Sequence, residues 1–217
     1  MCAYYPESKV EISKLTAKYY DILMNIITFG GYSLFIQKAI RLMNIKSNDR
    51  IIDLGAGTGR NACLMMNYLS TTGELIGLDI SSEMVTQFER RCASFANAKI
   101  INQRIDEPLP YENKFDKVFI SFVLHGFPQG VRRKIIKNTF KVLKKQGEFF
   151  ILDYNEFSVK EMSLYLKIPF KLIECPYAFD FVEKNWQKIL AEEGFNYFEK
   201  HLFFHGYVRL LKGVKVS

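Results

Sequence analysis

The stretch RIIDLGAGTGRNACLM, residues 50–65, places three glycines at alternate positions behind an apolar run and an aspartate. Glycine adopts backbone dihedral angles that are closed to other residues, and it lets a ligand approach the main chain closely. The apolar run predicts a strand, and the residues after the glycines predict a helix whose first turn has free N–H groups. A strand, a glycine-rich turn and a helix in this order are typical of a nucleotide-binding site.

Strand and helix patterns alternate along the chain around this turn. The segment 82–95 has helical spacing, with a Ser81/Ser82 cap and Glu83 in its first turn. Apolar runs predict strands at 50–55, 73–81, 98–104, 115–124 and 147–154. Repeated strand–helix units of this kind predict an α/β fold with a parallel, doubly wound sheet.

The C-terminal part of the chain has a different pattern. The segment DFVEKNWQKILAEEGF predicts one helix, with Asp180 and Glu183 as a capping box and Gly194 as its end. The residues after it predict two strands that join near His205 and Gly206. We therefore expect the fold to end in a hairpin.

The chain length predicts a single domain, since 217 residues are enough to bury a sizeable core. Two segments lie outside the strand–helix alternation, namely the helical N-terminal region and an aromatic-rich segment after the fifth strand. We expect, in order, an N-terminal helical cap at 1–44, a cofactor-binding core at 45–154, a substrate cap insertion at 155–180, and a helix with a terminal hairpin at 181–217.

Composition excludes several classes of protein. Apolar residues make up 48% of the chain and charged residues 24%, which is typical of a globular soluble protein. No apolar run approaches the roughly 18 residues that a membrane span needs, and the N-terminus lacks a signal-peptide pattern. The four cysteines, Cys2, Cys63, Cys92 and Cys175, have no CxxC spacing. We therefore expect no metal site, no disulfide framework and a cytoplasmic location.

The net charge of +7 is concentrated in residues 131–145, which contain no acidic residue. Apolar residues fall near helical spacing there, so the segment predicts an amphipathic helix with a basic outer face. That face is either simply solvated or contacts an anionic membrane surface or RNA. No zinc knuckle, RNP-type aromatic motif or GXXG clamp accompanies it, so a nucleic-acid partner is not expected.

The glycine turn differs from the common nucleotide motifs. Arg60 stands where the dinucleotide fingerprint G-x-G-x-x-G requires its third glycine, and no GK[ST] sequence follows. Asp79, at the end of the second strand, can accept hydrogen bonds from both hydroxyls of a ribose. Asp53, beside the turn, is poorly placed for a pyrophosphate but suits a ligand with a cationic head. The pattern favours an adenosine ligand that carries positive charge.

The segments DLGAGTG, GLDISSEM and VLKKQGEFFILD resemble the class I S-adenosylmethionine-dependent methyltransferases over roughly residues 45–154. The last segment is similar to that family's LKPGG turn, with Lys145–Gln146 in place of Pro–Gly. The resemblance implies methyl transfer from S-adenosylmethionine and a Rossmann-like, seven-stranded, mostly parallel sheet whose last strand is antiparallel. The C-terminal hairpin fits this expectation.

The resemblance implies a set of cofactor contacts, position by position. The residues of the glycine turn would line the methionine end of the cofactor, and those after the fourth strand would close the site. The expected contacts are Asp53, Gly55, Ala56, Gly57, Gly59, Asp79, Ile80, Met84, Asp106, Ser121 and Phe122.

Five of these positions have implied roles of their own. Asp53 would face the cofactor's amino group, Asp79 would hold the ribose, and Ile80 and Met84 would enclose the adenine. Asp106 would contact the adenine amino group, because RIDEPLPY resembles the family's GDAxxLPF with the acid one position late.

The segment KYYDILMNIITFG resembles the YDxMNxxxSFG pattern of the ubiquinone/menaquinone C-methyltransferases. The chain departs from that group downstream, with FVLHGF where GLRN is usual and LDYNEF around the usual EF. It also lacks the [DN]-P-P-[YF] motif of exocyclic-amine methyltransferases. The resemblance implies a small, apolar acceptor, of which a quinol is one case.

Aromatic residues make up 15% of the chain, and many lie in the two segments expected to cover the cofactor. They either stabilise the sheet edge or form a hydrophobic slot for a flat or lipid-like acceptor. His125, just past the fourth strand, is a candidate general base, with a hydrogen-bonded wall residue as the alternative. Tyr20 is a second candidate catalytic residue, with a role in positioning.

We therefore interpret the sequence as a methyltransferase acting on a small, apolar, quinol-type acceptor. One alternative is an RNA or protein methyltransferase that uses the basic helix 131–145. Another is a catalytically silent protein that binds S-adenosylmethionine without turnover. The sequence leaves the oligomeric state open.

Overall fold

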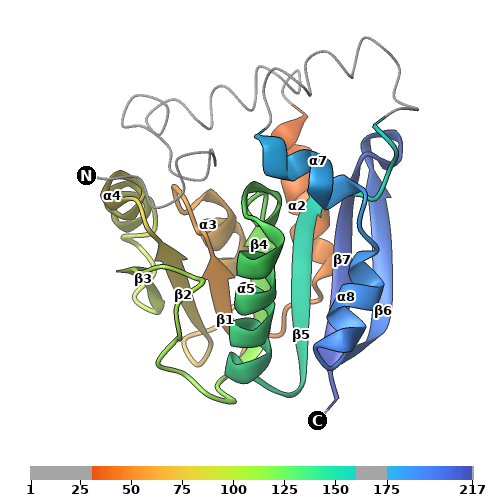
Figure 1. Cartoon of the computed structure of the whole chain (residues 1–217). Coiled ribbons are helices and arrows are strands. Elements are labelled where there is room, and N and C mark those ends of the chain that lie inside the picture. The colour runs from red at the N-terminus through yellow and green to blue at the C-terminus, as the bar shows by residue number, and fades with distance from the viewer. Residues whose placement is uncertain (1–30, 160–174, 217) are drawn as a thin grey trace.

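The computed structural model describes residues 31–159 and 175–216. Tyr20, most of the expected N-terminal cap and much of the expected substrate cap lie outside the described residues. Within them, strands and helices alternate as the sequence predicts, and Figure 1 shows the helices packed beside a central sheet.

A seven-stranded sheet forms the centre of the molecule, in the order β3-β2-β1-β4-β5-β7-β6. The five N-terminal strands are parallel, and β7 runs antiparallel to both of its neighbours. This confirms the predicted Rossmann-like sheet with a C-terminal antiparallel hairpin. The strands are β1 (Arg50–Leu54), β2 (Glu74–Asp79), β3 (Ala98–Asn102), β4 (Phe115–Ser121), β5 (Leu143–Tyr154), β6 (Phe195–Phe203) and β7 (Val208–Lys215).

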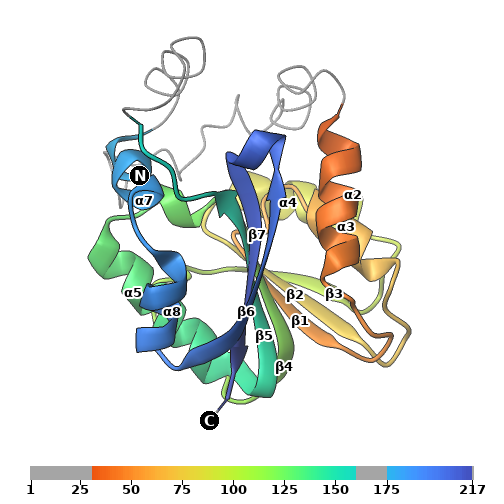
Figure 2. The same ribbon diagram turned by 90° about the vertical axis from the view of Figure 1, so that its right-hand side faces the viewer.

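Helices cover both faces of the sheet, as Figure 2 shows when the sheet is seen from its side. The helices are α2 (Tyr32–Leu42), α3 (Arg60–Met66), α4 (Ser82–Arg91), α5 (Gln129–Val142), α7 (Pro176–Val182) and α8 (Trp186–Glu192). Side chains of α2, α3 and α4 pack with one face of the strands, and those of α5, α7 and α8 with the other. Ile51 and Ile52 of β1 point into opposite clusters, which is why the central strands are apolar throughout.

The strand order reverses beside β1, because β2 lies on one side of it and β4 on the other. In open parallel sheets, ligands bind outside the carboxyl ends of the strands at such a reversal. The glycine turn follows β1 directly. The topology therefore puts that turn and the residues after β2, β4 and β5 at one edge of the sheet.

The segment predicted as one helix from Asp180 is two helices, α7 and α8. The predicted capping box is wrong, because Asp180 lies inside α7 and its carboxylate pairs with Arg132 and Lys184. Asn185 caps α8 instead, since its side chain accepts from the Lys188 N–H at 2.9 Å. Gly194 does follow the end of α8 with φ +96°.

The basic helix α5 departs from the expectation of an entirely solvated basic face. Lys134, Lys137 and Lys141 are exposed, whereas the Arg132 side chain is completely buried. Arg133 forms ion pairs with glutamates at the end of α8. In the described ranges, no helix is both long and apolar enough to cross a membrane.

Candidate active site

The glycine turn is fixed to the neighbouring strand by main-chain hydrogen bonds. The N–H groups of Gly55 and Ala56 both donate to the carbonyl of Leu78, at 2.8 and 2.9 Å. Gly55, Gly57 and Gly59 all have positive φ angles, of +76°, +54° and +80°. Residues with a side chain rarely adopt these angles, so the alternating glycines are a requirement of the turn itself.

The three glycines differ in what a side chain would meet. A Cβ at Gly55 would lie 2.7 Å from Val123, and a Cβ at Gly59 would lie 2.9 Å from Phe88. At Gly57, no described atom lies within 4 Å of that position. Gly57 therefore faces open space at the sheet edge, where a ligand can approach the backbone.

Asp79 connects the glycine turn to the start of α4. Its Oδ2 accepts from the Gly57 N–H at 2.8 Å, and its Oδ1 accepts from the Ser81 N–H at 2.9 Å. Burial raises the pKa of Asp79, and these backbone N–H groups act in the opposite direction. Asn102 donates to the carbonyls of Asp79 and Ile80, at 3.0 and 2.9 Å. The carboxylate is thus held at the edge of the open space beside Gly57.

Asp53 is the most perturbed carboxyl group at this edge. It is 1% exposed, and burial, followed by the charge of Asp79, raises its pKa to about 8. Its Oδ2 is buried and has no hydrogen-bond partner in the described part of the chain. A buried carboxyl oxygen without a partner fits a cationic ligand, because a positive charge beside it favours the ionised form, whose oxygen then accepts a hydrogen bond. The residues present therefore fit S-adenosylmethionine, which carries an ammonium and a sulfonium group.

The other expected cofactor contacts have varied surroundings. Met84 is buried at the start of α4, where its N–H donates to Ser81, and Ile80 is half-buried beside it. Asp106 forms a bidentate pair with Arg104, with distances of 3.1 Å to Nε and 2.8 Å to Nη2. That carboxylate is already engaged, and its expected contact with adenine stays a prediction.

Ser121 and Phe122 stand where β4 ends. Both are half-buried, and Phe122 has the left-handed φ angle of +53°. Its N–H donates to the carbonyl of Leu152 at 2.9 Å. Such a backbone angle costs energy in a residue with a side chain, and it turns the chain sharply from β4 towards His125.

His125 forms a hydrogen-bonded pair with Asp153 at the carboxyl ends of β4 and β5. The distance from His125 Nδ1 to Asp153 Oδ1 is 2.8 Å, and Asp153 Oδ2 accepts from the His125 main-chain N–H at 3.2 Å. The Asp153 side chain is 1% exposed and that of His125 14%. The rings of Tyr154 and Phe181 lie 5.1 and 6.3 Å from the imidazole ring. Sequence reasoning missed Asp153, although an acid at the end of the fifth strand was a usable signal.

Two buried arginines flank this pair. Arg132 donates to the carbonyl of His125 at 3.0 Å and to Asp180 at 2.7 Å. Arg209 lies opposite Asp153 in the β5–β7 ladder, and its Nη1 is 3.2 Å from the Glu156 carboxylate. Apart from this ion pair, the three buried guanidinium nitrogens of Arg209 have no hydrogen-bond partner among the described residues. The pair and the two arginines form a buried charged group beside an apolar wall.

Comparisons with known proteins agree with this architecture. A family model described as a methyltransferase domain matches residues 45–194. A demethylmenaquinone methyltransferase of Bacillus licheniformis is 28% identical over 181 residues, which cover 81% of this chain and 77% of the relative. One from Staphylococcus aureus is 28% identical over 186 residues, covering 83% and 75%. A crystal structure described as an SAM-dependent methyltransferase from Aquifex aeolicus has a TM-score of 0.71 at 17% identity, covering 95% of this chain and all of that one.

Proposed function

Because the chain belongs to the methyltransferase domain family and is a class I S-adenosylmethionine-dependent methyltransferase, we propose that it methylates a small, apolar, quinol-type acceptor. Two relatives that are 28% identical are demethylmenaquinone methyltransferases, and they support this acceptor class. The half-buried ring of Tyr154, 5.1 Å from the His125 ring, supports it too, because a flat acceptor ring packs well against an aromatic side chain.

The observation that carries the proposal is the His125–Asp153 pair. With Nδ1–H donating to Asp153, Nε2 is the nitrogen that accepts a proton from an acceptor hydroxyl. The buried carboxylate of Asp153 orients the ring and stabilises the imidazolium that results. Removal of the proton makes a quinol oxygen anionic and its ring carbon nucleophilic, which methylation at carbon requires.

The cofactor would lie across Gly57, between Asp53 and Asp79. S-adenosylmethionine would supply the methyl group, and its sulfur would lose its positive charge when that group is transferred. Asp53 would satisfy the cofactor's amino group through the carboxylate oxygen that is unpartnered in the described residues. Asp79 already holds two N–H groups, and its remaining lone pairs would accept from the ribose hydroxyls.

The buried surroundings favour this reaction. An anionic nucleophile and a cationic donor lose their charges in the transition state, so a site with little water disfavours the reactants more than the transition state. Most of the acceleration would come from holding the nucleophile in line with the methyl group.

The experiment is incubation of the purified enzyme with S-adenosylmethionine labelled in its methyl group and a fractionated cell extract. The expected result is label in the lipid fraction and, with a reduced quinone added, label in that quinone. Label in RNA or protein contradicts the acceptor class. If no fraction is labelled although the protein binds the cofactor, the proposal that the protein is an active methyltransferase is wrong.

Variants then separate the chemistry from binding. We expect His125→Gln to lower turnover by about 10² to 10⁴, the usual range for loss of a general base, with cofactor affinity unchanged. Asp153→Asn should lower turnover and shift the pH profile, because the amide cannot stabilise an imidazolium. His205→Asn is the matched control, since His205 is exposed in the hairpin turn and has a φ of +54° that asparagine tolerates.

A further inference from the structure

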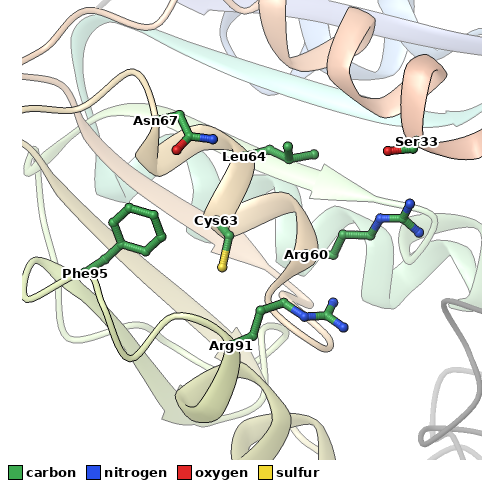
Figure 3. A pocket seen from close by; sticks show the side chains of 7 residues that line it. All are labelled: Ser33, Arg60, Cys63, Leu64, Asn67, Arg91 and Phe95. Atoms are coloured by element: carbon green, nitrogen blue, oxygen red, sulfur yellow. The ribbon is translucent and has the colours of Figure 1, made fainter.

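A cavity lies behind the glycine turn, between α3, α4 and α2. It has a volume of about 440 Å³ and is lined by Ser33, Arg60, Cys63, Leu64, Asn67, Arg91 and Phe95. In Figure 3, Arg60 and Arg91 extend in the same direction, and Cys63 projects from α3 on the side facing Arg91. Two of the described lining residues are arginines, and none of the described ones is acidic.

One wall of the cavity carries a thiol with a second thiol directly behind it. Cys63 is half-buried and lines the cavity, whereas Cys92, at the end of α4, is only 4% exposed. Their Sγ atoms are 2.6 Å apart, and neither cysteine is in a disulfide. A reagent in the cavity can therefore reach Cys63, and Cys63 can reach Cys92 without a rearrangement of the helices.

Charge selects the kind of reagent that would enter. Arg91 is held in place, because its Nη1 donates to Thr58 Oγ1 at 2.7 Å. Two guanidinium groups beside a thiol attract a molecule that carries carboxylates, and guanidinium binds carboxylates with good geometry. Leu64 and Phe95 add apolar surface for the body of such a molecule.

We propose that Cys63 is a thiol–disulfide exchange site for a low-molecular-mass disulfide that bears carboxylates, with Cys92 as the thiol that completes an intramolecular disulfide. In the first step the Cys63 sulfur attacks one sulfur of the reagent, whose S–S bond breaks, and one half departs as a thiol. In the second step Cys92 attacks the Cys63 sulfur, and the other half departs with the Cys92 proton. The protein loses two hydrogen atoms, and the reagent is reduced to two thiols.

The order of the two steps follows from burial. Burial, and then the hydrogen bond to Cys63, raise the pKa of the Cys92 thiol. A thiol is a nucleophile only as its thiolate, and Cys92 is not among the residues that line the cavity, so Cys63 meets the reagent first. The second step then uses the small ionised fraction of Cys92, which lies in contact with the Cys63 sulfur. The Sγ atom of Cys92 also lies 3.6 Å from the carbonyl oxygen of Gly59. The proposed disulfide would therefore form directly behind the glycine turn.

The test treats the folded protein with oxidised glutathione, blocks remaining thiols after denaturation with iodoacetamide, and maps the peptides by mass spectrometry. We expect a Cys63–Cys92 disulfide, while Cys175, which is 2% exposed, remains a thiol as the internal control. In Cys92→Ser the mixed disulfide should stay on Cys63, and in Cys63→Ser neither product should form. Alkylation of Cys63 to the same extent as Cys175 would overturn the exchange site.

A second comparison tests the charge requirement without depending on the cysteine variants. Arg91→Gln should slow the reaction with oxidised glutathione about tenfold, by loss of electrostatic attraction, and leave the rate with neutral bis(2-hydroxyethyl) disulfide unchanged. Equal slowing with both reagents, or no slowing with either, would overturn the carboxylate class of ligand.

Discussion

Asp53 is a residue whose position in the sheet explains its chemistry. It lies in β1, the central strand beside the order reversal, and is therefore buried by neighbours on both sides. A buried carboxyl oxygen without a partner costs about 1–3 kcal/mol. Retaining such a group is understandable where a cationic ligand completes its hydrogen bonding.

The pKa of Asp53 predicts a pH dependence of stability. Its pKa is about 8 in the folded protein against an ordinary value of 3.8. Between these values the folded protein holds a proton that the unfolded chain has released, so the free energy of unfolding falls as pH rises. This group contributes a slope of up to about 1.4 kcal/mol per pH unit between about pH 4 and pH 8. Urea unfolding of ligand-free protein at about pH 5 and pH 8 measures it.

Asp53→Asn is the control, because asparagine does not titrate. The variant should lose this contribution, so the two proteins should differ in how much stability they lose between the two pH values. Equal losses in both would contradict the raised pKa.

Binding of a cationic cofactor should also release a proton from the original protein near neutral pH, and none from the variant.

Gly57 and Gly59 predict different consequences for the same substitution. Gly57→Ala puts a methyl group into open space at a left-handed φ, which costs about 1–2 kcal/mol of stability. It should lower affinity for S-adenosylmethionine by about tenfold or more, since the methyl group occupies the approach to the backbone. Gly59→Ala should cost more stability, because its Cβ would lie 2.9 Å from Phe88.

Gly206→Ala supplies the matched control for Gly57. It has a φ of +91° in the hairpin turn, and no described atom lies near its Cβ position. The two alanine variants should lose similar stability in thermal unfolding, and only the change at position 57 should weaken binding in calorimetry. Unchanged affinity in Gly57→Ala would refute the ligand position proposed here.

At the scale of elements, Arg132 joins three parts of the fold. From α5 it donates to Leu124 and His125 of the short 3-10 helix Leu124–Gly126, and to the carbonyl of Tyr177 in α7. Its guanidinium also lies 5.2 Å from the Phe181 ring. The segment that carries His125 is therefore fixed from behind by a buried cation.

Arg132→Met tests this connection while keeping most of the side-chain volume. We expect a loss of about 3 kcal/mol in the free energy of unfolding, because three buried carbonyl groups lose their donor. Turnover should also fall, since the main chain of His125 loses its support. Arg133→Met is the control on the same helix, where a partly exposed side chain loses its two ion pairs and the change should be much smaller. Equal effects in urea unfolding would contradict the role of Arg132.

At the scale of the whole molecule, the net charge of +7 bears on where an apolar acceptor is met. Lys134, Lys137 and Lys141 form an exposed row on one face of α5. Each lysine near an anionic membrane surface contributes about 1 kcal/mol of attraction. We propose that this row brings the enzyme to membranes that hold its acceptor.

Replacement of these three lysines by glutamine should reduce sedimentation with vesicles that contain phosphatidylserine. Binding of the original protein should weaken as salt rises, because the attraction is screened. A variant with Lys38, Lys99 and Lys188 replaced by glutamine has the same net charge but loses exposed lysines from separate elements. Identical vesicle binding by the two variants would contradict a specific role of α5.

The sequence by itself determined the order of elements, the glycine turn and the acid at the tip of β2. These features are local, because hydrophobic period, turn geometry and capping depend on residues a few positions apart. The prediction of one helix from Asp180 was wrong. The hydrophobic period of the segment does not distinguish one helix from two helices separated by the cap at Asn185.

Tertiary structure alone decided which distant side chains meet. His125 pairs with Asp153 because β4 and β5 are neighbours in register, and Arg209 faces Asp153 because β7 inserts between β5 and β6. Arg132 is buried because α7 covers it, and Cys63 reaches Cys92 because α3 packs beside α4. Strand order and helix packing bring together residues far apart in the chain, and a local pattern carries no information about these pairings.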